Sequence, residues 1–223
     1  MWTEELALKI LDELFEKDLN SRIIALDFET KVLSKNEFLT NEMILGVSLA
    51  RRNKDGKIDY PYYILDNENL DAELSLLEKM DVILGNWNPL VIVGYGFRTY
   101  DIPLLAIKSQ RCRNNGQNFW KISNALNGAI HIELSDLVRY LLEQKLGESR
   151  KYLKMIEILK HPSFSDLPFI KTKELIDSSK EKKGVEIYES WKNKDSKFSL
   201  YLETESYNLI LITERIMEIY KKD

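Results

Sequence analysis

The feature that most constrains the fold is a short apolar run that leads directly into two acidic residues. The run extends from Arg22 to Leu26, and Asp27-Phe28-Glu29 follow it. A short, nearly continuous apolar run is typical of a strand buried in the middle of a sheet. Residues two apart project from the same face of a strand, so Asp27 and Glu29 share a face while Phe28 points away. The sequence therefore predicts a central strand that carries two neighbouring carboxylates at its end.

Two carboxylates on one face repel each other and resist ionising together unless a divalent cation lies between them. Metal binding is the simplest explanation of the pair. The same spacing occurs in Asp66-Asn67-Glu68 and Asp71-Ala72-Glu73, which lie in an expected loop and at an expected helix start. Only the first pair follows a buried strand. From spacing alone, a solvated strand end remains the alternative.

The rest of the chain predicts an α/β fold with a mixed five-stranded sheet flanked by helices. Further strands are expected over 43–51, 57–65, 90–93 and 129–134, and helices over 70–87, 101–108 and 135–145. The turn at Asp55-Gly56 favours a hairpin between the second and third strands. An N-terminal helix over 1–20, an irregular stretch over 147–197 with short helices near 151–159 and 185–191, and a closing helix over 198–221 complete the pattern. We expect residues 1–223 to form one domain.

Composition limits the class of protein. The chain has 223 residues, a formal net charge of −4 and one cysteine, Cys112, which excludes an internal disulfide and a zinc site built from several cysteines. The acids within the N-terminal apolar pattern argue against a signal peptide, and no stretch is apolar enough for a membrane span. We therefore expect a soluble, cytoplasmic protein. The negative charge argues against a large phosphate-binding surface, although bound metal ions would supply local positive charge.

Three segments resemble the motifs of the DEDD (DnaQ-like) 3′–5′ exonucleases, and in particular the proofreading exonuclease domain of B-family DNA polymerases. These segments are Ile23-Ile24-Ala25-Leu26-Asp27-Phe28-Glu29-Thr30, Val93-Gly94-Tyr95-Gly96-Phe97-Arg98-Thr99-Tyr100-Asp101-Ile102-Pro103 and Tyr201-Leu202-Glu203-Thr204-Glu205. The resemblance spans about residues 22–217 and implies a ribonuclease-H-like fold. Two positions depart from the family pattern, since Gly96 replaces an asparagine and Glu205 replaces an aspartate.

The resemblance implies a set of site residues and an activity. Its expected metal ligands, for two Mg²⁺ or Mn²⁺ ions about 3.5–4 Å apart, are Asp27, Glu29, Asp101 and Glu205. Tyr201 is expected to position the nucleophile. Its expected substrate contacts are Thr30, Phe97, Arg98 and Tyr100, with core packing as the alternative for the aromatic rings. The implied reaction removes nucleotides from the 3′ ends of DNA, with RNA as an open alternative. The implied partners are single-stranded or 3′-end nucleic acid and a DNA polymerase or repair complex.

A related subfamily replaces the tyrosine by a histidine that precedes an aspartate by five residues. Both histidines satisfy this spacing, His131 with Asp136 and His161 with Asp166. His131 lies in an expected strand and is interpreted as structural. His161 precedes the closing helix and is interpreted as a surface residue, with Asp166 kept as a reserve fourth ligand.

Two other interpretations remain open. Gly96 and Glu205 favour a catalytically weakened relative that binds nucleic acid or a replication or repair protein through the basic residues around Lys108, Arg111 and Arg113. The other alternative is an inert structural domain in which Asp27 and Glu29 are merely solvated.

Overall fold

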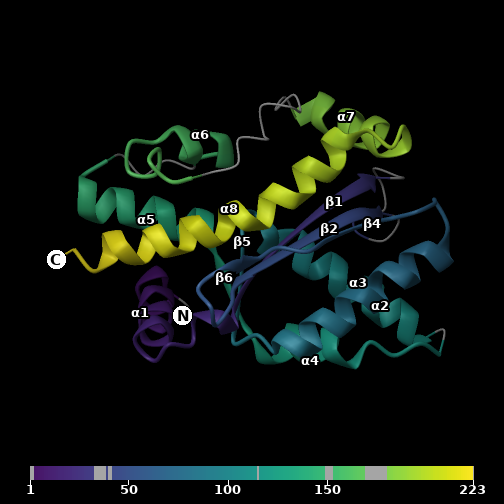
Figure 1. The fold of residues 1–223 in the computed structure, drawn as a ribbon, viewed down its shortest axis with the longest axis horizontal. Coiled ribbons are helices and arrows are strands. Elements are labelled where there is room, and N and C mark those ends of the chain that lie inside the picture. Colours follow the sequence, from purple (N-terminus) through teal and green to yellow (C-terminus); the bar gives the residue numbers. More distant parts are fainter. Residues whose placement is uncertain are drawn as a thin grey trace.

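The fold is a mixed β-sheet with helices packed against it (Figure 1). The computed structural model describes residues 3–32, 39, 42–114, 116–148, 153–168 and 180–222. Within these residues, the strands are β1 (Ile23–Val32), β2 (Glu42–Arg52), β3 (Ile58–Asp59), β4 (Tyr62–Ile64), β5 (Val91–Gly94) and β6 (Ile130–Glu133). Their order is β3-β2-β1-β5-β6, and β4 also pairs with β2. The predicted mixed α/β sheet is confirmed.

Strand β1 lies at the centre of the sheet. It pairs antiparallel with β2 and parallel with β5, and β5 pairs parallel with β6. In the β1–β2 register Asp27 is opposite Ser48 and Glu29 is opposite Gly46, and the register shifts between Glu29 and Thr30. The apolar run at the start of β1 is fully buried. The acidic pair therefore occupies the middle of a long central strand.

The helices are α1 (Glu4–Glu16), α2 (Leu70–Trp87), α3 (Asp101–Asn114), α4 (Trp120–Gly128), α5 (Leu134–Leu146), α6 (Met155–Lys160), α7 (Lys180–Lys192) and α8 (Ser196–Tyr220), with short 3₁₀ turns at Asn20–Arg22 and Phe97–Thr99. The helix predicted over 70–87 is confirmed at both ends. The first helix is shorter than predicted and ends at Glu16. None of the helices in the described ranges is long and apolar enough to cross a membrane.

The division of one expected strand and the presence of an additional helix also differ from the prediction. The single strand expected over 57–65 is divided into β3 and β4, so the described sheet has six strands instead of five. The division falls at Pro61, which has no N–H to donate to a strand ladder. Helix α4 was not predicted, because its start is capped by a residue distant in sequence. Asp81 of α2 accepts hydrogen bonds of 2.9 Å from the backbone N–H groups of Lys121 and Ile122.

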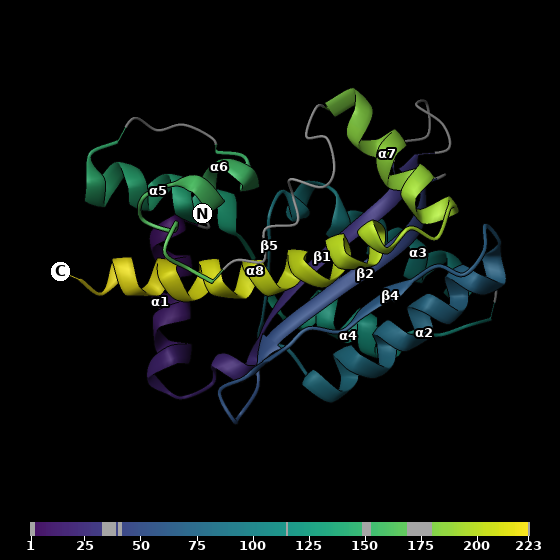
Figure 2. The same cartoon turned by 45° about the horizontal axis from the view of Figure 1, so that its top comes forward.

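The hydrophobic core lies on both faces of the sheet. Ile24, Leu26 and Phe28 of β1 belong to a cluster that includes side chains of α2, α3 and α4 and also reaches Tyr201 and Leu202 in the first half of α8. Ile23 and Ala25 belong to a second cluster with side chains of α1, α5 and α8. Helix α8 crosses the sheet along β1 and β2 in both views (Figures 1 and 2). Gly46, the partner of Glu29 on β2, lies against Leu202 of α8, so strand alternation directs the odd-numbered residues of β1 toward the face that α8 covers.

Candidate active site

Asp27 and Glu29 lie on the face of β1 that is covered by α8. Asp27 is half-buried and Glu29 is 7% exposed, whereas Phe28, which alternation turns to the other face of the strand, is 5% exposed. The strand alternation predicted from the sequence is thus present. Phe28 is a core residue, which is the interpretation that the sequence favoured.

Tyr201 and Glu205 project from one face of α8 into the same region. Their exposed fractions are 1% and 2%. Burial raises the pKa of the Tyr201 hydroxyl well above its ordinary value, and the negative charges of Glu205, Glu29 and Asp27 raise that pKa further. The same three carboxylates thus act on one phenol. The structure therefore brings together four of the five predicted catalytic residues, from two elements far apart in the sequence.

Asp101 occupies the first position of α3 and is 5% exposed. Its carboxylate raises the pKa of the neighbouring Tyr100, after the larger effects of burial and of Glu42. The Tyr100 hydroxyl donates to Glu42 and shares a hydrogen bond with the Thr30 hydroxyl. Thr30 follows Glu29 on β1 and Asp101 follows Tyr100, so this hydrogen bond connects the two segments that carry Glu29 and Asp101.

The turn before α3 is held by an acidic residue that the sequence did not identify as part of the site. Glu133 of β6 accepts hydrogen bonds from the backbone N–H groups of Gly96 at 2.7 Å and Arg98 at 3.5 Å. Gly96 has a φ of +74°, a conformation that glycine adopts without strain. The asparagine-to-glycine departure therefore has a local backbone role here. Glu133 was missed because its partners lie far earlier in the chain and its own segment reads only as a strand.

The predicted substrate contacts of the turn divide between surface and core. Arg98 is exposed, so its guanidinium is available to solvent. Phe97 is fully buried and packs edge-on against the His131 ring, with 6.3 Å between ring centroids. The prediction that Phe97 contacts a base is not supported, because a fully buried ring presents no face for stacking. Thr30 and Tyr100 contact each other as described above, and their contact with substrate remains a prediction.

The two histidines lie away from the carboxylate group. His131 is partly buried in β6, where burial and the nearby Arg98 charge lower its pKa. His161 contacts Glu148 at 3.1 Å. Asp166 is 2.8 Å from Arg215, which lies ten residues beyond Glu205 on α8, or about 15 Å along the axis. The proposal of Asp166 as a reserve ligand is therefore wrong in this arrangement.

The donor chemistry of the site fits a hard divalent cation. Asp27, Glu29 and Glu205 supply carboxylate oxygens, the ligands that Mg²⁺ and Mn²⁺ prefer. Within the described ranges, no three Asp, Glu, His or Cys side chains are close enough to hold a metal ion in their present rotamers. Neighbouring carboxylates repel each other, and a shared cation would draw them together.

Comparison with known proteins gives a structural likeness and no sequence match. No protein-family model and no curated protein matches the chain. The family B DNA polymerase of the hyperthermophilic archaeon Pyrobaculum calidifontis aligns with a TM-score of 0.52 and 16% identity, over 88% of this chain and 24% of that chain. The chain thus spans about a quarter of the polymerase. Its fold is ribonuclease-H-like, as predicted.

Two structures of E. coli exonuclease I align over a smaller part of the chain. The zinc-bound complex with single-stranded DNA has a TM-score of 0.37, 11% identity and coverage of 54% of this chain and 30% of that chain. The complex with a dT13 oligonucleotide has a TM-score of 0.38, 10% identity and coverage of 57% and 30%.

Proposed function

We propose that this protein is a metal-dependent exonuclease that removes nucleotides from the 3′ ends of DNA, with RNA as a second possible substrate. The observation that carries the proposal is the burial of Tyr201 among the carboxylates of Asp27, Glu29 and Glu205. Burying several carboxylates together is costly unless they bind a cation. The likeness to a family B DNA polymerase supports the fold that such a site requires.

Asp27, Glu29 and Glu205 would hold the divalent ions on the α8 side of β1, and Asp101 would contribute from the start of α3. When bound, Mg²⁺ or Mn²⁺ lowers the pKa of a coordinated water and neutralises charge on the phosphate under attack. Glu205 reaches one methylene further than an aspartate would. Its position on the same face of α8 as Tyr201 keeps its carboxylate within the group.

Tyr201 would orient the attacking water as a neutral phenol. Its raised pKa keeps the hydroxyl protonated at physiological pH. A protonated phenol donates one hydrogen bond and accepts others, so it positions a water without removing its proton. Tyr201 is therefore a positioning group in this mechanism.

The turn that contains Gly96 would present the Arg98 guanidinium to the nucleic-acid substrate. Glu133 fixes the backbone at Gly96 and Arg98 and leaves the Arg98 side chain exposed. An exposed guanidinium suits a phosphate, which it binds through two parallel hydrogen bonds. The substrate would be a single strand or the 3′ end of a duplex. A DNA polymerase or repair complex is the proposed protein partner.

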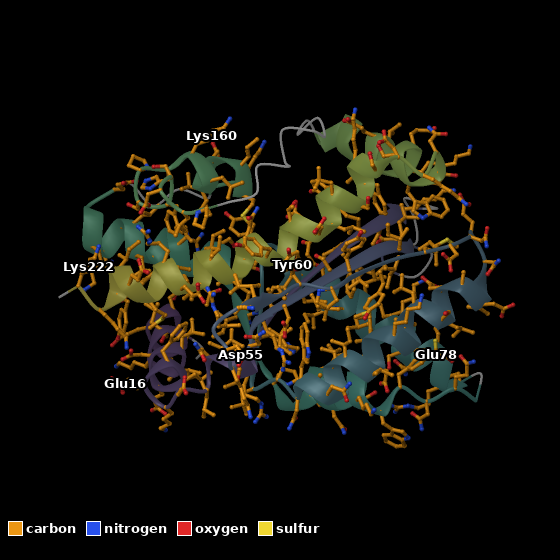
Figure 3. The ribbon with its side chains drawn as sticks, viewed as in Figure 1. Glu16, Asp55, Tyr60, Glu78, Lys160 and Lys222 are labelled. Carbon is orange, nitrogen blue, oxygen red and sulfur yellow. The ribbon has the colours of Figure 1, made fainter. Side chains whose placement is uncertain are left out.

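The test is cleavage of a 5′-labelled single strand with Mg²⁺ or Mn²⁺, comparing the native chain with Asp27→Ala. We expect a ladder that shortens from the 3′ end, requires metal and falls by about 10²–10³-fold in the variant, as when a group that stabilises a transition state is removed. Asp55→Ala is the matched control, because Asp55 is exposed in the turn between β2 and β3 (Figure 3) and should leave the rate unchanged.

Absence of cleavage with either metal, on DNA and RNA alike, would contradict the exonuclease proposal. A weakened relative that only binds nucleic acid would then lead, and Glu205, which replaces the aspartate of the family pattern, is the residue that favours it. Calorimetry with Mn²⁺ separates the two functions, since a decayed site would not bind the ion tightly.

A further inference from the structure

Gly46 of β2 lies directly beneath α8. A methyl group added at this glycine would be 2.4 Å from Leu202 Cδ1 and 3.1 Å from both Leu202 Cδ2 and Phe198 Cζ. Gly46 does not have a positive φ, so its backbone conformation is open to other residues. The requirement for glycine is therefore one of space. Leu202 is fully buried and Phe198 is 2% exposed, which leaves both side chains little room to move.

The position of Gly46 connects this contact to the carboxylate group. Gly46 is paired with Glu29 across the β1–β2 ladder. Leu202 is adjacent to Tyr201, whose hydroxyl is under the influence of Glu29. The close approach of helix and strand thus occurs where the two halves of the site meet.

The side chains on the same face of β2 remain small in the residues after Gly46. Ser48 and Ala50 are the next residues on that face, both are fully buried, and they are opposite Asp27 and Ala25. At the far end Arg52 binds Glu214 of α8, with 2.7 Å between Nε and Oε1. Helix α8 therefore runs along this face of β2 (Figure 2). The distance between the helix and the strand at Gly46 is limited by the contact with Leu202.

We propose that Gly46 is a positioning residue for the carboxylate site. Its missing side chain lets α8 approach β1 closely enough to hold Tyr201 and Glu205 against Glu29 and Asp27. This inference rests on the proposed exonuclease function for its kinetic consequence. A methyl group at Gly46 would push Leu202 outward and lift the helix, and a displacement of about 1 Å costs roughly 10²-fold in rate when reacting groups must be aligned.

The experiment uses four full-length variants, Gly46→Ala, Leu202→Ala, their combination and Gly128→Ala, at a temperature where each is fully folded by circular dichroism. Gly128 is the matched control, because an added methyl there meets nothing within 4 Å and its φ is not positive. We expect Gly46→Ala to lower kcat by about 10²-fold with KM nearly unchanged. Leu202→Ala should restore at least a tenth of the native kcat in the double variant, because it removes the obstructing side chain.

A second measurement reads the geometry without activity. The ¹³C-labelled ring resonance of Tyr201, assigned by its loss in Tyr201→Phe, should shift in Gly46→Ala, return toward its native position in the double variant and remain in place in Gly128→Ala. If Gly46→Ala does not fold, the double variant is compared with Leu202→Ala in the same two assays. In that comparison the Tyr201 resonance and kcat of the double variant should be close to those of Leu202→Ala, because the methyl group added at Gly46 occupies the space that the Leu202 side chain has left.

A Tyr201 resonance unchanged by Gly46→Ala, or a loss of kcat that Leu202→Ala does not relieve, would overturn the inference. If the native chain itself cleaves nothing, the exonuclease proposal fails, while the shift and recovery of the resonance still decide whether Gly46 sets the position of α8.

Discussion

The two halves of α8 lie on the same sheet and differ in what they bury. The first half buries Phe198 and Leu202 together with a larger set of polar side chains, namely Tyr201, Thr204, Glu205, Ser206 and Asn208. The second half buries mainly apolar side chains, namely Leu209, Ile210, Leu211, Ile212, Ile216 and Met217, with Thr213 as a buried polar one. Its Arg215 and Glu214 form ion pairs with other segments. Buried carboxylates cost stability and apolar contacts supply it. The comparison indicates that the second half contributes more to stability, while the first half carries the polar side chains of the proposed site.

The largest expected effect is a loss of stability from a substitution in the second half. Ile212 is fully buried. Ile212→Ala should lower the free energy of unfolding by about 2–5 kcal/mol, because it removes buried methyl groups and leaves a cavity. Urea denaturation measures this loss. Ile219→Ala is the control, since Ile219 is only partly buried at the edge of the same cluster and should cost less. An equal or smaller loss for Ile212→Ala would contradict the larger contribution of this half to stability.

A smaller effect on stability, of opposite sign, is expected in the first half. Glu205→Gln removes one negative charge from the group around Tyr201 and keeps the shape of the side chain. The free energy of unfolding should stay the same or rise by up to about 1 kcal/mol, as is common when a functional site is relieved of repulsion. Cleavage should fall by about 10²-fold.

Glu203→Gln is the matched control for that prediction. Glu203 is half-buried on the same helix, and neither the rate nor the stability should change appreciably. A clear loss of stability in Glu205→Gln would mean that the carboxylate is a structural group, and the contrast between the two halves would disappear.

The sequence predicted most of the sheet and the carboxylate group because both depend on local patterns. The alternation at Asp27, Phe28 and Glu29 fixes which side chains share a face, and the one-turn spacing of Tyr201 and Glu205 does the same on a helix. The structure brings these residues together as predicted. Whether they cut nucleic acid remains a prediction.

The features that the sequence did not predict depend on contacts between distant segments. The start of α4 is capped by Asp81 from another helix, the turn at Gly96 is held by Glu133, and the space for Leu202 is left by Gly46. In each case the residue itself carries no local signal, since a surface-type acid or a glycine within a strand has many uses. Phe97 illustrates the reverse error, because a ring next to a glycine turn suggests substrate contact until its burial is known.

The smallest expected effect is a change in stability on substitution of Asp166, which pairs with Arg215 in the second half of α8. The hydrogen bond from Arg215 lowers the pKa of the Asp166 carboxyl below its ordinary value. A carboxyl whose pKa is lower in the folded state contributes stability that is present above its unfolded pKa and is lost as pH falls through the folded pKa. Asp166→Asn should therefore be slightly less stable than the native chain at pH 7, and the difference should begin to shrink near about pH 4 and vanish only below the lowered folded pKa of Asp166. Urea midpoints across that range measure the effect. Cleavage and Mn²⁺ affinity should be unchanged, because Asp166 pairs with the part of α8 that lies beyond the site. A loss of either would mean that Asp166 is a metal ligand after all, and the two halves of α8 would then no longer differ in function.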